Sequence, residues 1–550
     1  MDSISRSVLA VLCLATVLAT VTPARAEEIT VDAKTRHQTI EGWGTSMIFW
    51  KRSQTPYRDP AWREAYRDLG LNILRLNINK EVLVDASGDL AVPVALSADL
   101  KANIEKMSFA DPKTKVYGDM AVWLRRNALE PERVRIVGSV WSPPHWMKGP
   151  TDKKQSHVSN PSVKKRTPWL SGGKDGDSIG GRLLQSPENA QQFGRYLAAW
   201  VEGFEQHYGV PIYAASLQNE LSFENPFDSA TYEKGEGGKN GQWWQYAAAL
   251  KAVKDEFTRQ GIQTKLMGPH VAHVGEKPSN PWGLLHQMSY IEAVKAHRDP
   301  QLIGFLSHYN SNGYLGTSED SVKMWAAYYR GKAAVPANWA RWTKAPGVAF
   351  DRKPIWVSEA GGAKSAWLTG SKGSPGEGAI IVAQKMHNAL VHTNASAYLY
   401  WQMSDTSDLE TEHTLLGKKH VQTPTQSKKY SAFKHFSRYV RPGAVRVSAT
   451  FTNGKSSVGG RSAYDTYNSL NVSAYLHEED RTFTVVLVNM RASNEPVSVR
   501  VPTTLPVGRM EAYLTSTTTS FARQRELPVS GGQVSLEVPG YAVLTLHGRW

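Results

Sequence analysis

Eight short, mostly apolar segments recur between residues 40 and 401, with amphipathic stretches of helical spacing between them. The apolar segments are residues 40–44, 73–78, 135–140, 214–218, 265–268, 304–307, 355–358 and 397–401. The clearest helical patterns cover residues 187–208, 242–260 and 378–392. Eight buried strands that alternate with helices predict an α/β fold, and favour a closed (β/α)8 (TIM) barrel over an open doubly wound sheet.

The pattern changes after about Tyr439, where apolar and polar residues begin to alternate and no helical period is visible. The alternating segments are residues 444–452, 470–476, 482–489, 497–501, 509–514 and 541–547. Such segments, bounded by Gly, Pro and Asn, predict a C-terminal antiparallel β-sandwich attached to the barrel. Residues 28–31 also have the composition of a strand and are a candidate to join that sheet. We therefore expect a barrel over residues 27–440 and a β-domain over 441–550.

The first 26 residues have the pattern of a cleaved signal peptide. Arg6 supplies a positive charge, residues 8–18 form a short apolar run, and residues 24–26 (ARA) match an A-x-A cleavage site. No later stretch reaches the roughly 18 apolar residues that a membrane span needs. The pattern predicts a secreted or periplasmic protein without a membrane span. Its only cysteine, Cys13, lies within the signal, so no disulfide is expected.

Composition narrows the function classes. The chain has 550 residues, 41% hydrophobic, and contains 18 Trp and 22 Tyr, which suits a globular protein and is frequent in sugar-binding clefts. The formal net charge of +14 is compatible with a nucleic acid or an acidic polymer as partner. No helix-turn-helix, zinc-finger or RNA-binding motif is visible, so we expect no nucleic-acid partner. We expect a monomer.

Two glutamates stand where barrel chemistry is expected. The fourth apolar segment runs into Asn219-Glu220, and the seventh ends at Glu359. Active sites of these barrels lie at the carboxyl ends of the strands, and glycoside hydrolysis needs two carboxyl groups that face each other. The alternative is that each glutamate only forms a salt bridge with an arginine. The pair together favours a catalytic role.

Other catalytic motifs are missing from the sequence. No HExxH, GxSxG or P-loop pattern is present, and His270 and His273 form no evident site with a carboxylate. We therefore predict no metal and no cofactor.

Five motifs, in order along the chain, resemble glycoside hydrolase family 30. They are IEGWG at residues 40–44, WSPPHWMK at 141–148, SLQNE at 216–220, YWQ at 400–402 and FSRYVRPG at 436–443. The resemblance covers nearly the whole chain after the signal and implies a retaining (β/α)8 glycosidase with an attached β-sandwich. It leaves the subfamily open, although residues 42–46 are closer to the galactanase-like branches than to the glucuronoxylanases.

The resemblance also assigns roles to residues. Glu220 would be the acid/base, Glu359 the nucleophile, and Asn219 would bind the sugar 2-hydroxyl. Arg75 would lie beside the nucleophile. Aromatic and histidine side chains would line the subsites. These further substrate-binding candidates are Trp43, Trp141, Trp146, His308, Tyr309 and Trp401. The family shows His-x-Tyr after the sixth strand, whereas this chain has adjacent His308-Tyr309, so His308 is the stronger of the two candidates.

A polysaccharide or oligosaccharide is therefore the expected substrate, cleaved by an endo-acting enzyme of β-1,6-galactanase, xylanase or exopolysaccharide glycanase type. An exo-β-glycosidase or a glucosylceramidase-like enzyme is the alternative. Two non-enzymatic functions are further alternatives: a non-catalytic carbohydrate-binding protein and a basic adhesin.

One charged segment bears on the substrate. Residues 148–174 contain seven basic residues and one acidic residue, Asp152. They are Lys148, Lys153, Lys154, Lys164, Lys165, Arg166 and Lys174. They form either a solvated loop or an electropositive rim for an acidic glycan.

Overall fold

The computed structural model describes most of the chain after the signal segment. The described residues are 26–48, 56–83, 93–149, 182–183, 187–221, 228–232, 246–271, 284–314, 317–334, 347–405 and 407–550. The predicted signal peptide lies outside them, apart from Ala26. In this part of the chain no helix is long and apolar enough to cross a membrane.

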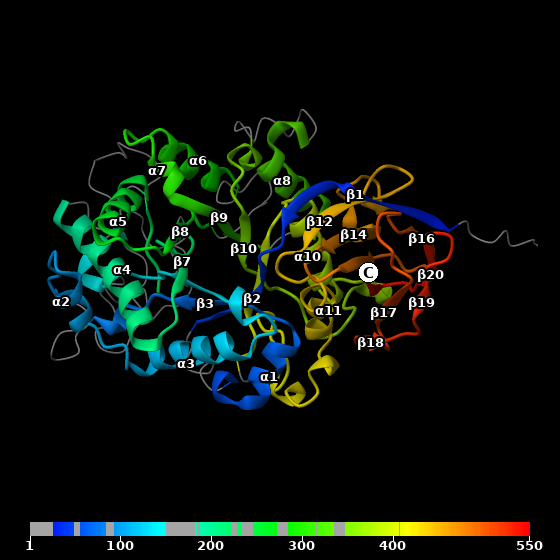
Figure 1. The fold of residues 1–550 in the computed structure, drawn as a ribbon, viewed down its shortest axis with the longest axis horizontal. Helices are drawn as coiled ribbons and strands as arrows, with labels where there is room; N and C mark the ends of the chain where they lie inside the picture. Colours follow the sequence, from blue (N-terminus) through cyan, green and yellow to red (C-terminus); the bar gives the residue numbers. More distant parts are fainter. Residues whose placement is uncertain are drawn as a thin grey trace, which may run out of the picture.

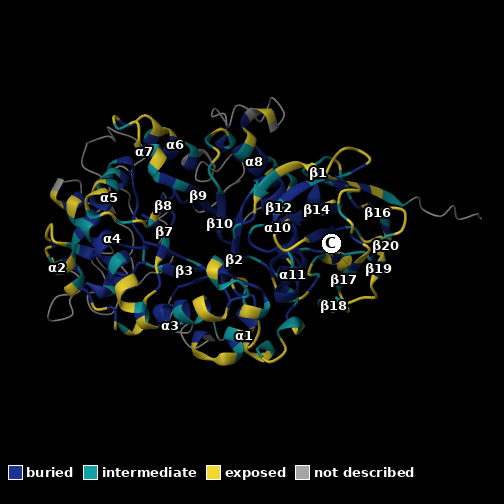
Figure 2. Ribbon diagram, viewed as in Figure 1, coloured by how far each residue is buried: buried dark blue, intermediate teal, exposed yellow. Residues whose placement is uncertain are grey.

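Eight parallel strands close into a barrel, as the sequence predicts (Figure 1). In chain order they are β2 (Gly42–Met47), β3 (Ile73–Asn77), β4 (Arg135–Ser139), β7 (Ile212–Ser216), β8 (Lys265–Met267), β9 (Leu306–Asn312), β10 (Ile355–Glu359) and β11 (Ala397–Gln402). Each strand pairs with its neighbours in chain order, and β11 pairs with β2 to close the ring. Their residues are almost all buried (Figure 2). Buried parallel strands need apolar residues on both faces, which is why the sequence shows continuous apolar segments.

Helices surround the barrel. They are α1 (Pro60–Asp68), α2 (Leu100–Glu105), α3 (Pro112–Asn127), α4 (Pro187–Tyr208), α5 (Tyr246–Gln260), α6 (Leu284–Lys295), α7 (Leu302–Phe305), α8 (Glu319–Arg330), α10 (Ile380–Val391) and α11 (Lys428–Ser437). Aspartates cap the N-termini of α1, α2 and α3, where their side chains accept hydrogen bonds from backbone N–H groups. A short β-ribbon of β5 (Lys148–Gly149) and β6 (Arg182–Leu183) lies beyond β4.

The C-terminal region forms one mixed sheet that curls around its own core. Its strands are β1 (Glu27–Thr39), β12 (Val445–Phe451), β13 (Ser457–Val458), β14 (Leu470–His477), β15 (Thr482–Asn489), β16 (Glu495–Arg500), β17 (Arg509–Thr515), β18 (Ala522–Arg523), β19 (Leu527–Pro528), β20 (Gln533–Val538) and β21 (Ala542–Arg549). Strand β1, from the start of the fold, pairs antiparallel with β12 and parallel with β16. The sheet is therefore not purely antiparallel.

The β-domain shares its packing with the barrel. Along β15, Val485 and Leu487 belong to the core of the β-domain, whereas Val486 and Val488 belong to the large core that includes the barrel and its helices. Alternate residues of a strand point to opposite faces, so this strand is buried on both sides. Figure 1 shows α10 and α11 between the two regions. This layer connects barrel and β-domain without a solvated linker.

The structure explains why two positions of the IEGWG motif are glycine. Gly42 has a φ of 147°, and a Cβ there would lie 2.0 Å from Asn72 Oδ1. A Cβ on Gly44 would lie 2.1 Å from the Ile73 carbonyl oxygen on the next strand. Both positions need glycine so that β2 can approach its neighbours closely.

Candidate active site

Glu359 is the last residue of β10 and points into the upper end of the barrel, where the strands have their carboxyl ends. Its side chain is buried and accepts two hydrogen bonds from neighbouring side chains. Arg75 Nη1 donates to Oε2 at 2.7 Å, and the Tyr314 hydroxyl donates to Oε1 at 2.5 Å. Burial, followed by the charge of Glu359, raises the pKa of Tyr314 well above its usual range, so this hydroxyl stays a donor. A cation and a neutral donor thus orient one carboxylate.

Glu220 lies just beyond β7 in a left-handed backbone conformation, with φ of 55°. Such a conformation is uncommon for a residue with a Cβ and often marks a functional position. The side chain is buried, and Asn312 Nδ2 donates to its Oε1 at 2.9 Å. The preceding Asn219 accepts a 2.8 Å hydrogen bond on Oδ1 from Arg75 Nη2. Glu359, Arg75 and Asn219 thus form one connected set of side chains, and Glu220 follows Asn219 directly in the chain.

Arg75, on β3, is the centre of that set. Its guanidinium reaches Asn219 with one nitrogen and Glu359 with another, and Nε donates to Ser139 Oγ at 3.2 Å. The guanidinium carbon lies 4.4 Å from the centroid of the Trp141 ring. Burial lowers the pKa of Arg75, and the Glu359 charge opposes that shift. A guanidinium stays protonated in proteins, so Arg75 supplies a fixed positive charge between the strands.

Two of the predicted aromatic residues belong to this end of the barrel. Trp141 follows β4 and Trp401 lies on β11, and their rings are 6.1 Å apart in a tilted arrangement. With Ile48 they form a small apolar cluster next to Arg75. Both are largely buried by the described residues, and they shape this end of the barrel above β2 and β3, the two strands that separate β11 from β4.

Of the other predicted aromatic and histidine residues, Trp146 lies in the short turn His145–Met147 that follows β4, and the remaining three lie elsewhere. Trp43 is fully buried, donates from Nε1 to the Val440 carbonyl and packs on Phe433 and Phe436 of α11. It connects β2 to α11 because side chains on a barrel strand alternate between the interior and the helices. Its assignment to substrate binding was wrong. Trp146 packs against the large barrel core.

The assignment of His308 and Tyr309 to the substrate cleft also needs correction. Strand β9 does not end near them but continues to Asn312, so both lie low in the barrel. His308 contacts Trp356 and approaches Glu41 at the opposite end, and the Tyr309 hydroxyl donates to Asp351. The apolar pattern stopped at residue 307 because the rest of β9 is polar, and most of these polar side chains form hydrogen bonds with other parts of the fold.

The sequence analysis missed Asn312, Tyr314 and His270. Asn312-Gly313-Tyr314 stands where the family pattern has His-x-Tyr, with asparagine in place of histidine. The Asn-x-Tyr spacing is the sequence feature that could have identified Asn312 and Tyr314. His270, beyond β8, receives the Glu220 backbone N–H on Nδ1 at 2.7 Å. Only the fold brings that histidine, 50 residues away along the chain, to the turn.

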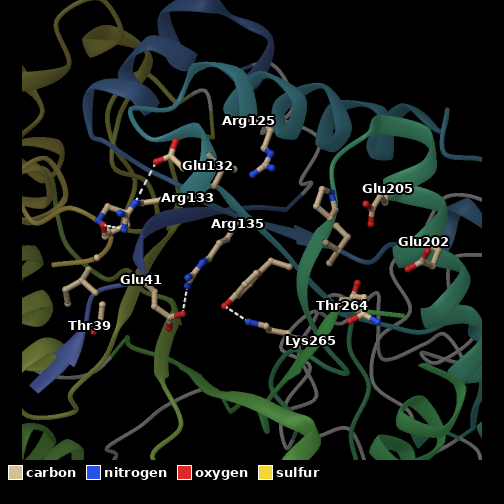
Figure 3. A pocket seen from close by; sticks show the side chains of 18 of the residues that line it. Thr39, Glu41, Arg125, Glu132, Arg133, Arg135, Glu202, Glu205, Thr264 and Lys265 are labelled. Carbon is tan, nitrogen blue, oxygen red and sulfur yellow. Dashed lines mark hydrogen bonds and ion pairs between the residues drawn. The ribbon is translucent and has the colours of Figure 1, made fainter. Parts of the chain in front are cut away.

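A cavity of about 770 Å³ lies at the amino end of the strands (Figure 3). Its lining mixes acids and bases, among them Glu41 and Arg135, which are ion-paired, and Glu202 and Glu205 of α4. Burial, and then the nearby charge of Glu205, raise the pKa of Glu202. The Tyr213 ring is covered by Arg135 at 4.5 Å and Lys265 at 4.4 Å. Among the described residues that line the cavity, no second buried carboxylate accompanies Glu41, and two cations already cover the Tyr213 ring, so this cavity is not the site of the predicted chemistry.

Within the described residues no cluster of His, Cys, Asp and Glu could hold a metal ion. Of the basic segment, only Lys148 lies in the described chain. It is buried and donates from Nζ to the Ser229 carbonyl, so Lys148 is not part of an electropositive rim. The remaining basic residues, Lys153, Lys154, Lys164, Lys165, Arg166 and Lys174, lie outside the described residues.

Known proteins share this architecture. No family model matches the sequence. The GH30 endoxylanase from Clostridium papyrosolvens C71 aligns with a TM-score of 0.61 at 18% identity, over 95% of this chain and all of the other. The catalytic domain of GH30 xylanase C from Talaromyces cellulolyticus gives 0.62 at 18% identity over the same shares. An endo-β1,6-glucanase gives 0.58 at 16% identity, over 95% of this chain and 94% of its own. This chain therefore has the fold of these glycoside hydrolases, a TIM barrel with an attached β-rich domain.

Proposed function

We propose that the protein is a retaining β-glycosidase of glycoside hydrolase family 30. One observation carries the proposal: two buried glutamates lie at the carboxyl ends of β7 and β10, and Arg75 bonds both Glu359 and Asn219, the residue directly before Glu220. Paired carboxyl groups at this end of a barrel suit double displacement. Proteins with this fold include named xylanases and an endo-β1,6-glucanase, which supports the assignment.

In the first step Glu359 attacks the anomeric carbon while Glu220, protonated, gives its proton to the leaving oxygen. The bond from the anomeric carbon to that oxygen breaks, and a glycosyl-enzyme ester forms on Glu359. Arg75 and Tyr314 hold the attacking carboxylate in one orientation. In the second step Glu220 takes a proton from water, which attacks the anomeric carbon and releases Glu359. Asn219, held by Arg75, is available to bind the 2-hydroxyl.

We further propose that the enzyme is secreted, is endo-acting and cleaves a polysaccharide with acidic substituents. The predicted signal peptide supports export, and the basic excess in residues 148–174 supports the acidic substituents, although Lys148 is excluded from it. An exo-glycosidase is the second candidate.

Incubation with a panel of defined β-glucans, xylans, glucuronoxylans and β-1,6-galactans tests the proposal, with products identified by mass. Glu359→Gln, which keeps the shape of the side chain, is the matched inactive control. Proton NMR during the first turnovers should show the β-anomer, as retention requires. Initial release of the α-anomer would disprove the retaining mechanism. Lack of cleavage across the panel, or equal activity of the Gln variant, would disprove the assignment.

A further inference from the structure

His270 supplies two of the hydrogen bonds that hold the backbone turn at Glu220. The left-handed φ at Glu220 points two successive N–H groups toward the segment after β8. The Glu220 N–H donates to His270 Nδ1 at 2.7 Å, and the Leu221 N–H donates to the His270 carbonyl at 3.0 Å. A strained conformation persists only where its surroundings hold it. The imidazole and carbonyl of one histidine supply that support.

The same imidazole continues into a closed ring of hydrogen bonds. Nδ1 accepts from a backbone N–H and so carries no proton, which places the proton of the neutral ring on Nε2. Nε2 lies 2.8 Å from Asn312 Oδ1 and therefore donates to it. This bond fixes the orientation of the Asn312 amide, so that Nδ2 faces Glu220 Oε1 at 2.9 Å. The ring starts at the Glu220 backbone and returns to its carboxyl group.

The surroundings keep the histidine neutral. His270 is almost fully buried, and its second ring contact is Ser358 Oγ at 3.1 Å. Burial, and then the charge of Arg75, hold the pKa of His270 well below its usual range. A charged imidazole would offer a proton instead of an acceptor to the Glu220 N–H. The neutral form is the one the turn requires.

We propose that His270 is a positioning residue for the acid/base: it holds the Glu220 backbone through Nδ1 and orients the Glu220 carboxyl group through Asn312. The inference rests on the proposed function. It adds a residue just beyond β8 that touches no substrate and acts through two partners, the Glu220 backbone and Asn312. The proton-transfer step is sensitive to the placement of the acid, whereas attack by Glu359 does not involve this ring.

Two substitutions distinguish the hydrogen bond to the Glu220 N–H from the hydrogen bond to Asn312. His270→Asn puts an amide oxygen near the Nδ1 position and keeps an acceptor for the Glu220 N–H, but loses the contact with Asn312. His270→Gln puts an amide nitrogen near the Nε2 position and keeps the donor to Asn312, but leaves the Glu220 N–H without its acceptor. His308→Gln is the matched control, because His308 is also buried inside the barrel but lies at its opposite end.

The measurement is kcat/KM on two aryl β-glycosides of the sugar that the panel identifies, one with a poor phenol leaving group and one with a dinitrophenol leaving group. A good leaving group needs no acid in the first step. Both His270 variants should lose about 10- to 100-fold on the poor leaving group and at most about 3-fold on the good one. His308→Gln should show no such split. His270→Asn should lose less than His270→Gln.

Equal losses on both substrates, or none, would overturn the inference, because a merely structural role lowers both rates together. The proposed function is judged separately, by wild-type cleavage and its loss in Glu359→Gln. If wild type cleaves both substrates and Glu359→Gln does not, the function stands even where the His270 split fails. If a variant is recovered in low yield, the ratio of the two kcat/KM values still decides, since it is independent of the amount of folded enzyme.

Discussion

The two ends of the barrel each hold a buried carboxylate beside an arginine and an aromatic ring, yet their chemistry differs. At the lower end Glu41 is ion-paired with Arg135 (Figure 3). It also accepts hydrogen bonds from Trp356 Nε1 at 2.6 Å and Ser396 Oγ at 2.7 Å. His308 Nε2 lies 3.3 Å from the same carboxylate. At the upper end Glu359 has two donors, Arg75 and Tyr314.

The two carboxylates differ in how many of their lone-pair positions remain unoccupied by hydrogen-bond donors. A carboxylate has about four lone-pair positions, and at Glu41 donors take up nearly all of them. At Glu359 donors occupy two, within the described residues, and a second glutamate is connected through Arg75 and Asn219. A buried carboxylate is therefore a structural anchor where donors saturate it and a candidate for catalysis where a second carboxyl group joins it. This agrees with the general division of TIM barrels into a stabilising lower face and a reactive upper face.

The largest contrast should come from matched Glu→Gln substitutions at the two ends. Glu359→Gln should lower kcat per folded molecule by about 1000-fold or more. Glu41→Gln should leave kcat per folded molecule unchanged and lower the free energy of unfolding by about 2–4 kcal/mol, because Arg135 and Trp356 lose an ionised partner. Denaturant unfolding and initial rates on the same preparations give both values. A Glu41→Gln variant that is stable but inactive would reverse the comparison.

Substitutions of the two arginines, Arg75 and Arg135, should also affect catalysis more at the upper end than at the lower end, but with smaller changes in kcat/KM. Arg75→Lys keeps the charge but cannot reach Asn219 and Glu359 together, so kcat/KM should fall by about 100-fold. Arg135→Lys, at the lower end, keeps a cation near Glu41 and should change kcat/KM little. Kinetics on the substrate found in the panel, at one fixed pH, compare the two. Equal losses in both variants would show that the arginine at the upper end has no special role.

The lower end should also make the fold sensitive to acid. Burial by itself raises the pKa of Glu41, but hydrogen bonds and charges from His308, Arg135 and Trp356 outweigh it and hold this pKa below its ordinary value. The stabilisation is therefore present above about pH 4.5 and is lost as the pH falls below it. Between pH 5 and pH 3 the wild type should lose about 2 kcal/mol more than Glu41→Gln. Urea unfolding at both pH values measures the difference, and parallel curves would contradict it.

The smallest expected effect concerns the substrate at the upper end. Replacing Lys153, Lys154, Lys164 and Lys165 together by Ser should lower kcat/KM on glucuronoxylan a few-fold at low ionic strength, and leave a neutral xylan unaffected. Attraction between surface charges is screened over about 8 Å at physiological salt, so the effect should fade as salt is added. If the variant resembles the wild type on both polymers, or neutral polymers are better substrates throughout, the basic segment has no role in substrate choice.

The sequence by itself determined the fold class and the two glutamates. Eight apolar segments specified the barrel, because strands buried on both faces leave a continuous apolar signature. The helix expected over 187–208 has those bounds, and the alternating strands after residue 440 appear where expected. Glu359 directly follows an apolar segment and Glu220 follows one after Asn219, so the local order of residues was enough to make both candidates.

Only the tertiary structure decided which side chains meet those glutamates. Strand β9 extends through polar residues that are stable only because partners from other strands satisfy them, so its true end at Asn312 left no apolar signal. Trp43 and Tyr309 resembled cleft residues by position, but alternation along their strands turns them toward the helices. His270 acquires its role across 50 residues of chain. Contacts between strands depend on barrel closure, and no local pattern in the sequence encodes which side chains that closure brings within hydrogen-bonding distance.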